Sequence, residues 1–402
     1  MLIRSRFATN TLYLVISHGL GAILSFLLAA MIGRSLGESG LGYYASALAW
    51  VFPISLLADF GISTLIVRDA AKSPERGAGL VRFGVWLRWA LAGGLMVVLA
   101  LAALMLESDP TSRQVIWLAM PLVLIQPLYS TYSAIFRAQQ RMGLIAVLHL
   151  GMLGSQVVLT AVALLNSASI QWVMVINTVT SGVQMAVAWW LYRQCCGNIK
   201  ASEPDVKATL QAAAPFALAA FLGALQLRLN VLILDLLAPA AVVGVYAAAA
   251  RFVDLGTLLA RAVYDALYPA LSAEQKDEKR NRTFYQAVGL LILGSVGLAV
   301  VFTIGATWLI SLVYGGAFSG ADDVLAWAGW ALLPNILKNV RIVYWYARGQ
   351  EAFTNWVYGI SIGIQIVLGL LLIPTMGALG AVLAGAIADS ISALLLWLHQ
   401  ER

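Results

Sequence analysis

The sequence has few charged residues and no long hydrophilic stretch. Asp, Glu, Lys and Arg make up only 11% of its 402 residues, whereas a soluble domain carries roughly 25%. Hydrophobic residues account for 61% of the chain. This scarcity of charge argues against a soluble globular protein and leaves no room for a separate soluble domain. The composition therefore predicts an all-α polytopic membrane protein.

Cysteine and histidine are also scarce. The two cysteines, Cys195 and Cys196, are adjacent in a predicted cytoplasmic loop, where a structural disulfide is not expected. The three histidines, His18, His149 and His399, are too far apart along the chain to indicate a metal site. We therefore expect neither a bound metal nor another cofactor.

Long apolar runs fill most of the chain. Twelve of them are long enough to cross a bilayer, which takes about 20 residues of helix. They cover approximately residues 10–33, 41–66, 81–105, 114–136, 144–165, 171–191, 211–236, 242–271, 284–312, 323–347, 353–373 and 379–398. The first run is too long for a signal-peptide core and has no small-residue cleavage site after it, so it is expected to remain in the mature protein.

Basic residues are distributed unevenly between the loops. With the N-terminus in the cytoplasm, sixteen Lys and Arg residues fall in inside loops, and only Arg34 and Arg113 fall in outside loops. This excess follows the positive-inside rule. It predicts that both termini are cytoplasmic, and it explains the net charge of +6 without a nucleic-acid partner.

Two short matches indicate an internal repeat. Residues 42–47 match residues 244–249 at an offset of 202, and residues 154–159 match residues 363–368 at an offset of 209. The matched runs are predicted to cross the membrane in the same direction, which is typical of parallel repeats in transporters.

The largest inside loop lies near the middle of the chain and divides six predicted spans from six. We therefore predict an N-terminal six-helix bundle over residues 1–195, a cytoplasmic linker over residues 196–210 and a C-terminal six-helix bundle over residues 211–402. Two parallel bundles of this kind would enclose a central cleft.

The predicted span at 242–271 carries charged residues on one helical face. Arg251, Asp254, Arg261 and Asp265 lie at i, i+3, i+10 and i+14. A charge at mid-membrane costs about 2.5–3.5 kcal/mol on insertion scales, so this face is expected to meet protein or water rather than lipid. It could line a transport pathway, or its members could pair along the helix as structural ion pairs.

Two charged residues of the N-terminal half carry competing interpretations. Asp59 corresponds to Arg261 by the 202-residue offset. It could pair with Arg261 across the cleft, bind a coupling proton or cation, or cap the turn before Gly61. Arg88 lies within two turns of the predicted cytoplasmic edge, where a structural role with a snorkelling side chain is expected.

The C-terminal half contains further polar residues inside predicted spans. Arg228 lies in the span at 211–236, and Asn335, Lys338 and Asn339 form a cluster in the span at 323–347. Asp389 lies near the centre of the last span, where it could be neutral, paired with a basic neighbour, or part of a coupling-ion site. Fixed cations in a low-dielectric cleft would attract an anion such as phosphate.

Several segments together resemble a known family. They are Ile32–Tyr44, Ala58–Ile62, Gly244–Tyr246, Tyr314–Gly316 and Ile373–Ala381, which are spread in order over nearly the whole chain. The set is similar to bacterial polysaccharide flippases, the O-antigen and capsule repeat-unit translocases of the multidrug/oligosaccharidyl-lipid/polysaccharide exporter superfamily. The lipid II flippase branch of that superfamily usually has spans 13 and 14, which the sequence does not show, so this branch is disfavoured.

The resemblance implies a V-shaped two-bundle transporter, not an enzyme, in the bacterial cytoplasmic membrane. Its expected substrate is an undecaprenyl-pyrophosphate-linked oligosaccharide, moved from the cytoplasmic to the periplasmic leaflet by alternating access. Its expected partners are an H⁺ or Na⁺ gradient, and polysaccharide polymerase machinery is a further possibility. The residues assigned to diphosphate or sugar binding are Arg261, Arg251, Lys338, Arg228, Asn335 and Asn339, and those assigned to ion coupling are Asp59, Asp254, Asp265 and Asp389.

Three alternatives carry less weight. A drug or metabolite exporter of the same superfamily would share the fold, because fold does not determine substrate. A membrane-bound polymerase or glycosyltransferase typically needs a substantial outside loop, whereas every predicted outside loop is short. A major-facilitator carrier would have a glycine-aspartate-basic signature after the second span, and residues 68–76 do not contain it.

Overall fold

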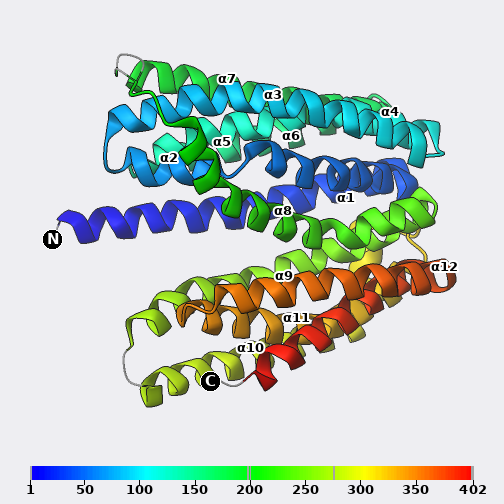
Figure 1. Ribbon diagram of the computed structural model, residues 1–402. Coiled ribbons are helices and arrows are strands. Elements are labelled where there is room, and N and C mark those ends of the chain that lie inside the picture. The colour runs from blue at the N-terminus through cyan, green and yellow to red at the C-terminus, as the bar shows by residue number, and fades with distance from the viewer. Residues whose placement is uncertain (1, 197–198, 200, 275–276, 400–402) are drawn as a thin grey trace. The chain divides into compact units, whose positions relative to one another are not determined.

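The computed structural model describes residues 2–196, 199, 201–274 and 277–399 (Figure 1). These residues form α-helices joined by short turns. The helices are α1 (Leu2–Asp59), α2 (Ile62–Ala70), α3 (Pro74–Leu106), α4 (Pro110–Ala119), α5 (Leu122–Ala138), α6 (Met142–Leu165), α7 (Ile170–Cys196), α8 (Val206–Leu237), α9 (Ala240–Ala273), α10 (Asp277–Tyr314), α11 (Ala321–Ala347) and α12 (Glu351–Leu398). The predicted all-helical class is confirmed for the described residues.

The helices do not correspond one to one with the predicted spans. Helix α1 contains the run at 10–33 and most of the run at 41–66, and α12 contains both of the last two runs. Each long helix has one non-helical glycine, Gly37 (φ 69°, ψ −170°) in α1 and Gly377 (φ 55°, ψ −128°) in α12. Positive φ is accessible to glycine without a steric penalty. Figure 1 shows the orange first part and the red second part of α12 meeting where the chain turns back.

Two other predicted spans are interrupted. The run at 41–66 breaks between α1 and α2, where Phe60 (φ 51°) and Gly61 (φ 69°) are left-handed. The run at 114–136 breaks between α4 and α5 beside Pro121, which cannot donate a backbone hydrogen bond. The first of these breaks places Asp59 at the end of one helix and Ser63 in the first turn of the next.

Nine helices in the described part of the chain are long and apolar enough to cross a membrane. Two of them, Tyr13–Asp59 and Ala352–Leu398, contain 47 residues each. At 1.5 Å per residue each would extend about 70 Å, more than twice the roughly 30 Å hydrocarbon thickness of a bilayer. The protein is therefore a multi-pass membrane protein, while twelve crossings and two six-helix bundles stay predictions.

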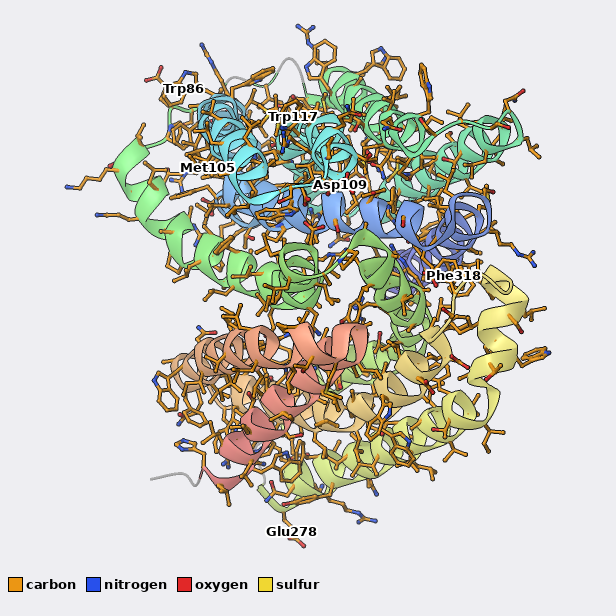
Figure 2. The ribbon with its side chains drawn as sticks, turned by 90° about the vertical axis from the view of Figure 1, so that its right-hand side faces the viewer. Trp86, Met105, Asp109, Trp117, Glu278 and Phe318 are labelled. Atoms are coloured by element: carbon orange, nitrogen blue, oxygen red, sulfur yellow. The ribbon has the colours of Figure 1, made fainter. Side chains whose placement is uncertain are left out.

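Large apolar side chains face outward, as expected for helices in lipid. Met105 is 83% exposed, Leu165 86% and Ile304 82%. Trp86 and Met105, labelled in Figure 2, project from the surface of α3. Such exposure would be unfavourable in water, whereas lipid chains cover it without penalty.

The residues group into two compact units. The first comprises Met1–Leu28 and Ser46–Arg228, and the second comprises Ala29–Ala45 and Leu229–Arg402. Each has its own apolar core: Ile66 and Phe136 lie in the first, and Phe284 and Trp345 in the second. This grouping reflects spatial proximity and does not test the predicted linker at 196–210.

Two glycines of the predicted repeat meet within the second unit. A Cβ atom on Gly42 would overlap the carbonyl oxygen of Ala240, and one on Gly244 would overlap that of Glu38. Gly42 and Gly244 differ by 202 positions, as do Glu38 and Ala240. The contact of Gly42 with Ala240 is therefore the repeat equivalent of the contact of Gly244 with Glu38. A close crossing of this kind is expected where two equivalent helices meet at a pseudo-two-fold axis.

Candidate functional site

A buried charged cluster lies in the first unit, formed by Asp59, Ser63, Arg88 and Ser130 (the Asp59 cluster). Nη2 of Arg88 donates to Oδ1 of Asp59 at 2.7 Å and to Oγ of Ser63 at 2.9 Å. Oγ of Ser63 also donates to Asp59 at 2.7 Å, and Oγ of Ser130 donates to Ser63 at 2.8 Å. The cluster thus joins the end of α1 to α2, α3 and α5.

The local sequence makes room for this pair. Gly84 lies one turn before Arg88 on α3, and a Cβ there would be 2.6 Å from Nη1 of Arg88. The Arg88 side chain is fully buried and Asp59 is 8% exposed. Nε and Nη1 of Arg88 have no hydrogen-bond partner in the described part of the chain. Because the ion pair is buried, removal of one partner leaves an uncompensated charge, which costs about 3–5 kcal/mol.

This cluster corrects two expectations. Arg88 does not snorkel toward an aqueous edge, because its guanidinium is held within the helices by Asp59 and Ser63. Asp59 pairs with Arg88 of its own unit, whereas the sequence had suggested Arg261 as its partner. The predicted coupling role of Asp59 stays a prediction.

A second buried cluster lies in the second unit, between α11 and α12 (the Lys338 cluster). Nζ of Lys338 is 2.5 Å from Oδ1 of Asp389, and Nδ2 of Asn335 donates to Oδ2 of the same carboxylate at 2.7 Å. Asn339 donates to Oδ1 of Asn335 at 3.0 Å, and the Lys338 ammonium lies 5.7 Å from the ring centroid of Tyr358.

Two predicted roles therefore fall within a single ion pair. Lys338 is 4% exposed, and its charge is balanced by Asp389, which was assigned to ion coupling. The sequence analysis left open that Asp389 is paired with a basic neighbour, and the structure has this pair. Contact of Lys338 with a phosphate would require the pair to open, so both functional assignments stay predictions.

The charged stripe on α9 is different. Arg251 and Asp254 form a long ion pair of 3.9 Å, with the Asp254 side chain 63% exposed. Arg261 and Asp265 are both exposed, and no ion pair joins them among the described side chains. Of the candidate cations, Arg261 is thus the one whose guanidinium is most open to a ligand.

Two further arginines, Arg228 and Arg341, lie against aromatic rings. The guanidinium of Arg228 in α8 lies 5.4 Å from the ring centroid of Phe52, within the first unit. Arg341 in α11 lies 4.5 to 5.6 Å from the centroids of four rings, those of Phe284, Tyr344, Trp345 and Trp397. These contacts are cation–π interactions, which help to hold a charge in apolar surroundings.

The sequence analysis missed another polar network in the second unit. Gln365 donates to Oδ1 of Asn230 at 2.7 Å, and Nδ2 of Asn230 donates to the hydroxyl of Tyr246 at 3.0 Å. Gln365 is the counterpart of Gln156 in the repeat match, and both glutamines are buried. Two buried glutamines at equivalent repeat positions were the signal that could have identified this network.

The fold and the charged helices together define a class. The described residues form helices with apolar side chains on their outer faces, and they place arginine, lysine and aspartate inside segments long enough to span a membrane. This combination is typical of a multi-pass transporter. Groups of three or more His, Cys, Asp or Glu able to hold a metal are absent from the described residues.

Comparison with known proteins identifies the family. Residues 7–275 match the family described as "Polysaccharide biosynthesis protein", which is more than half of the chain. The chain belongs to this family. The resemblance to polysaccharide flippases of the exporter superfamily is thereby confirmed.

One curated relative and two solved structures extend this result. The probable low-salt glycan biosynthesis flippase Agl15 of Haloferax volcanii is 21% identical over 401 residues, covering 96% of this chain and 82% of that protein. The lipid II flippase MurJ in an inward closed conformation has a TM-score of 0.79 at 14% identity, covering 96% of this chain and 86% of that one.

An inward-facing multidrug resistance MATE family transporter of the MOP superfamily has a TM-score of 0.76 at 15% identity. It covers 94% of this chain and 93% of that one. At such identities the structures show a shared fold alone. The family and these similar proteins are transporters and flippases rather than enzymes.

Proposed function

We propose that the protein is a flippase for undecaprenyl-pyrophosphate-linked oligosaccharide repeat units in a bacterial cytoplasmic membrane. It moves them from the cytoplasmic to the periplasmic leaflet by alternating access, with both termini cytoplasmic. Membership of the polysaccharide biosynthesis family supports this function, as does the likeness to a protein described as a glycan biosynthesis flippase.

The exposed Arg261 on α9 carries the proposal. The side chain lies on a helix that is apolar and long enough to span the membrane, yet it has no carboxylate partner among the described residues. A cation in that position costs about 2.5–3.5 kcal/mol unless water or an anion meets it. The diphosphate of a lipid-linked sugar supplies such an anion, and arginine binds phosphate oxygens in a bidentate manner.

Arg251 extends the same binding face. It lies ten residues before Arg261, about 15 Å along the helix axis, which is enough for a diphosphate and the first sugars to lie between the two. Arg228, Asn335, Asn339 and Lys338 are kept as further candidates, with Lys338 acting only after release from Asp389. Polysaccharide polymerase machinery is the expected downstream partner.

A proton or sodium gradient is the proposed energy source. A coupling carboxylate must exchange its ion during the cycle, which favours Asp265 and Asp254, since both are exposed. Asp59 and Asp389 are each neutralised by a buried cation. For these two carboxylates, coupling would mean that protonation or Na⁺ binding releases Arg88 or Lys338.

The test uses a strain in which the flippase gene is deleted and replaced by variants of this protein. Arg261→Ala is expected to abolish surface polysaccharide and to accumulate lipid-linked intermediates, because the diphosphate loses its cation. Arg261→Lys should restore part of the activity. Arg76→Ala, which removes an exposed arginine near the start of α3, is the matched control and should behave as wild type.

Membrane abundance of each variant is measured by immunoblot. Normal polysaccharide in the Arg261→Ala strain at normal abundance would contradict the proposal. A drug or metabolite exporter of the same superfamily is the competing function, supported by the fold shared with the MATE transporter. It predicts that deletion changes efflux of small molecules and leaves surface glycans intact.

A further inference from the structure

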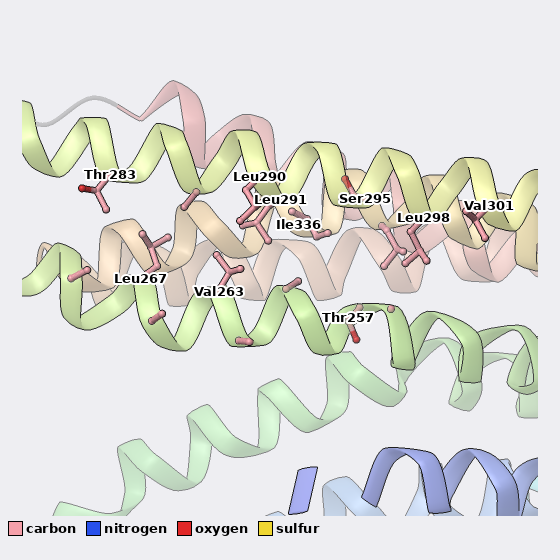
Figure 3. A pocket seen from close by; sticks show the side chains of 18 residues that line it. Thr257, Val263, Leu267, Thr283, Leu290, Leu291, Ser295, Leu298, Val301 and Ile336 are labelled. Carbon is pink, nitrogen blue, oxygen red and sulfur yellow. The ribbon is translucent and has the colours of Figure 1, made fainter. Parts of the chain in front are cut away.

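An apolar groove of about 760 Å³ lies between α9 and α10 in the second unit, with α11 contributing Leu332 and Ile336 (Figure 3). Hydroxyls of Thr257, Thr283 and Ser295 are its only polar side-chain groups among the lining residues, and none of those residues is charged. Figure 3 shows side chains of both helices, among them Val263 and Leu291, directed into the space.

Small residues account for ten of the 18 that line the groove, which leaves space between the two helices. Gly256 and Ala260 on α9 and Ala287 and Gly294 on α10 would permit close packing of the two helices. Leu298 of α10 packs against Gly256, and the rest of the space between the two helices holds no side chain. An apolar cavity that stays empty loses dispersion contacts on every wall, so in a membrane a hydrocarbon chain is the stable filling.

The length of the groove distinguishes between hydrocarbon chains. Its lining on α10 runs from Thr283 to Val301. Eighteen steps of 1.5 Å give about 27 Å, close to the roughly 30 Å hydrocarbon thickness of a bilayer. An acyl chain of a phospholipid reaches across one leaflet only, about half of that thickness. A polyprenyl chain is long enough to occupy the whole groove.

Charge is present at one end only. Before Thr283, helix α10 carries Asp277, Glu278, Lys279, Arg280 and Arg282, a net charge of +1, and it has no charged residue from Thr283 to its end at Tyr314. Arg280 precedes Thr283 by three positions and therefore lies on the groove face of the helix. An end with a small excess of positive charge, joined to an apolar channel, complements an amphiphile with an anionic head and a long chain.

Helix α9 separates this groove from the charged stripe. Gly256, Ala260 and Leu267 line the groove, whereas Arg261 and Asp265 point roughly half a turn away on a 3.6-residue helix. One helix thus presents an apolar face to a lipid chain and a charged face to a polar head group.

We propose that the α9–α10 groove binds the polyprenyl chain of the lipid carrier, with the phosphate end at Arg280. This inference rests on the proposed function, because it locates the lipid part of the same substrate. The polyprenyl chain stays in the membrane while its head group crosses, so a binding groove beside the charged stripe keeps the lipid carrier attached throughout the movement.

The variant that tests binding in the α9–α10 groove is Gly294→Leu. A Cβ at Gly294 meets no atom within 4 Å, so the leucine is accommodated and its side chain fills the groove. Gly289→Leu is the matched control, since Gly289 also has open space around it, is on the same helix and does not line the groove. Both substitutions raise helix propensity, so neither is expected to impair folding.

The assay uses the purified full-length protein in lipid nanodiscs with a sugar-free C55 polyprenyl phosphate that carries a photoreactive diazirine on its chain. Mass spectrometry should find labelled peptides of α9 and α10. Labelling should fall on the order of tenfold in Gly294→Leu, equivalent to about 1.4 kcal/mol of binding free energy, and should be unchanged in Gly289→Leu. A C10 prenyl phosphate should compete poorly.

Three results would contradict binding of the polyprenyl chain in the α9–α10 groove: labelling confined to other helices, equal labelling in both leucine variants, or equal competition by phosphatidylglycerol. Equal competition would indicate that the groove holds an ordinary boundary lipid. None of these affects the proposed function, which is judged by wild-type transport of the lipid-linked oligosaccharide. If labelling fails while wild-type transport is intact, only the proposed binding site in the α9–α10 groove is wrong. If labelling succeeds but gene deletion leaves surface glycans unchanged, the proposed function is wrong.

Discussion

The buried ion pairs and the stripe on α9 use the same residue types in opposite ways. Arg88 and Lys338 are almost completely buried, and each has a carboxylate within 2.7 Å. Arg261 and Asp265 are exposed on a helix of similar apolarity. A charge inside a membrane segment is therefore not by itself evidence of a pathway. What distinguishes a candidate binding residue is the lack of a partner in its own unit.

The largest effect is expected where a buried pair is broken. Asp59→Ala leaves the fully buried guanidinium of Arg88 without its carboxylate and should destabilise the protein by about 3–5 kcal/mol. Thermal unfolding in detergent, followed by intrinsic tryptophan fluorescence, measures this loss.

A double variant separates stability from coupling. Asp59→Leu with Arg88→Met removes both charges and should recover most of the stability, since apolar replacements of buried pairs are often neutral. If the double variant also transports with unchanged dependence on the ion gradient, Asp59 is not a coupling residue. A double variant as unstable as Asp59→Ala would contradict the assignment of the pair as the source of the loss.

The second effect is expected in the Lys338 cluster and should be smaller. Asp389→Asn keeps an acceptor for Asn335 and a polar partner for Lys338, so we expect a loss of about 1–3 kcal/mol in stability. Lys338 also retains its contact with Tyr358. Asn335→Ala is the control that removes a hydrogen bond to the carboxylate without removing a charge. A loss in Asp389→Asn no larger than that in the control would mean that the ion pair does not stabilise α11 against α12.

Much of the fold could be predicted because it depends on local pattern. Apolar runs and positive loops indicated the helices, and ten of the twelve predicted spans each lie within one helix. The continuation of α1 through Gly37 and of α12 through Gly377 could not be predicted, since residues around each glycine read equally well as a loop. A single residue with positive φ performs the reversal that a loop would otherwise provide.

The charged pairs were only partly predictable. Periodicity shows which residues share a face of one helix, but not which neighbouring helix that face meets. A simple measure of depth would have found both pairs. Asp59 and Arg88 each lie seven residues from the predicted inner ends of their spans, and Lys338 and Asp389 each lie nine. Residues of opposite charge at equal depth in neighbouring helices are placed to pair.

The smallest effect on stability is expected on α9, and it sharpens the comparison most. Asp254 makes a 3.9 Å contact with Arg251 and its side chain is 63% exposed, so Asp254→Asn should change stability by less than about 1 kcal/mol. The same unfolding measurement applies. If Asp254 takes part in coupling, this stable variant should lose dependence on the H⁺ or Na⁺ gradient in vesicles. A large loss of stability would instead mean that Asp254 belongs to a structural ion pair. Unaltered gradient dependence at normal stability would leave Asp265 as the better coupling candidate, because its carboxylate is exposed and has no partner among the described side chains.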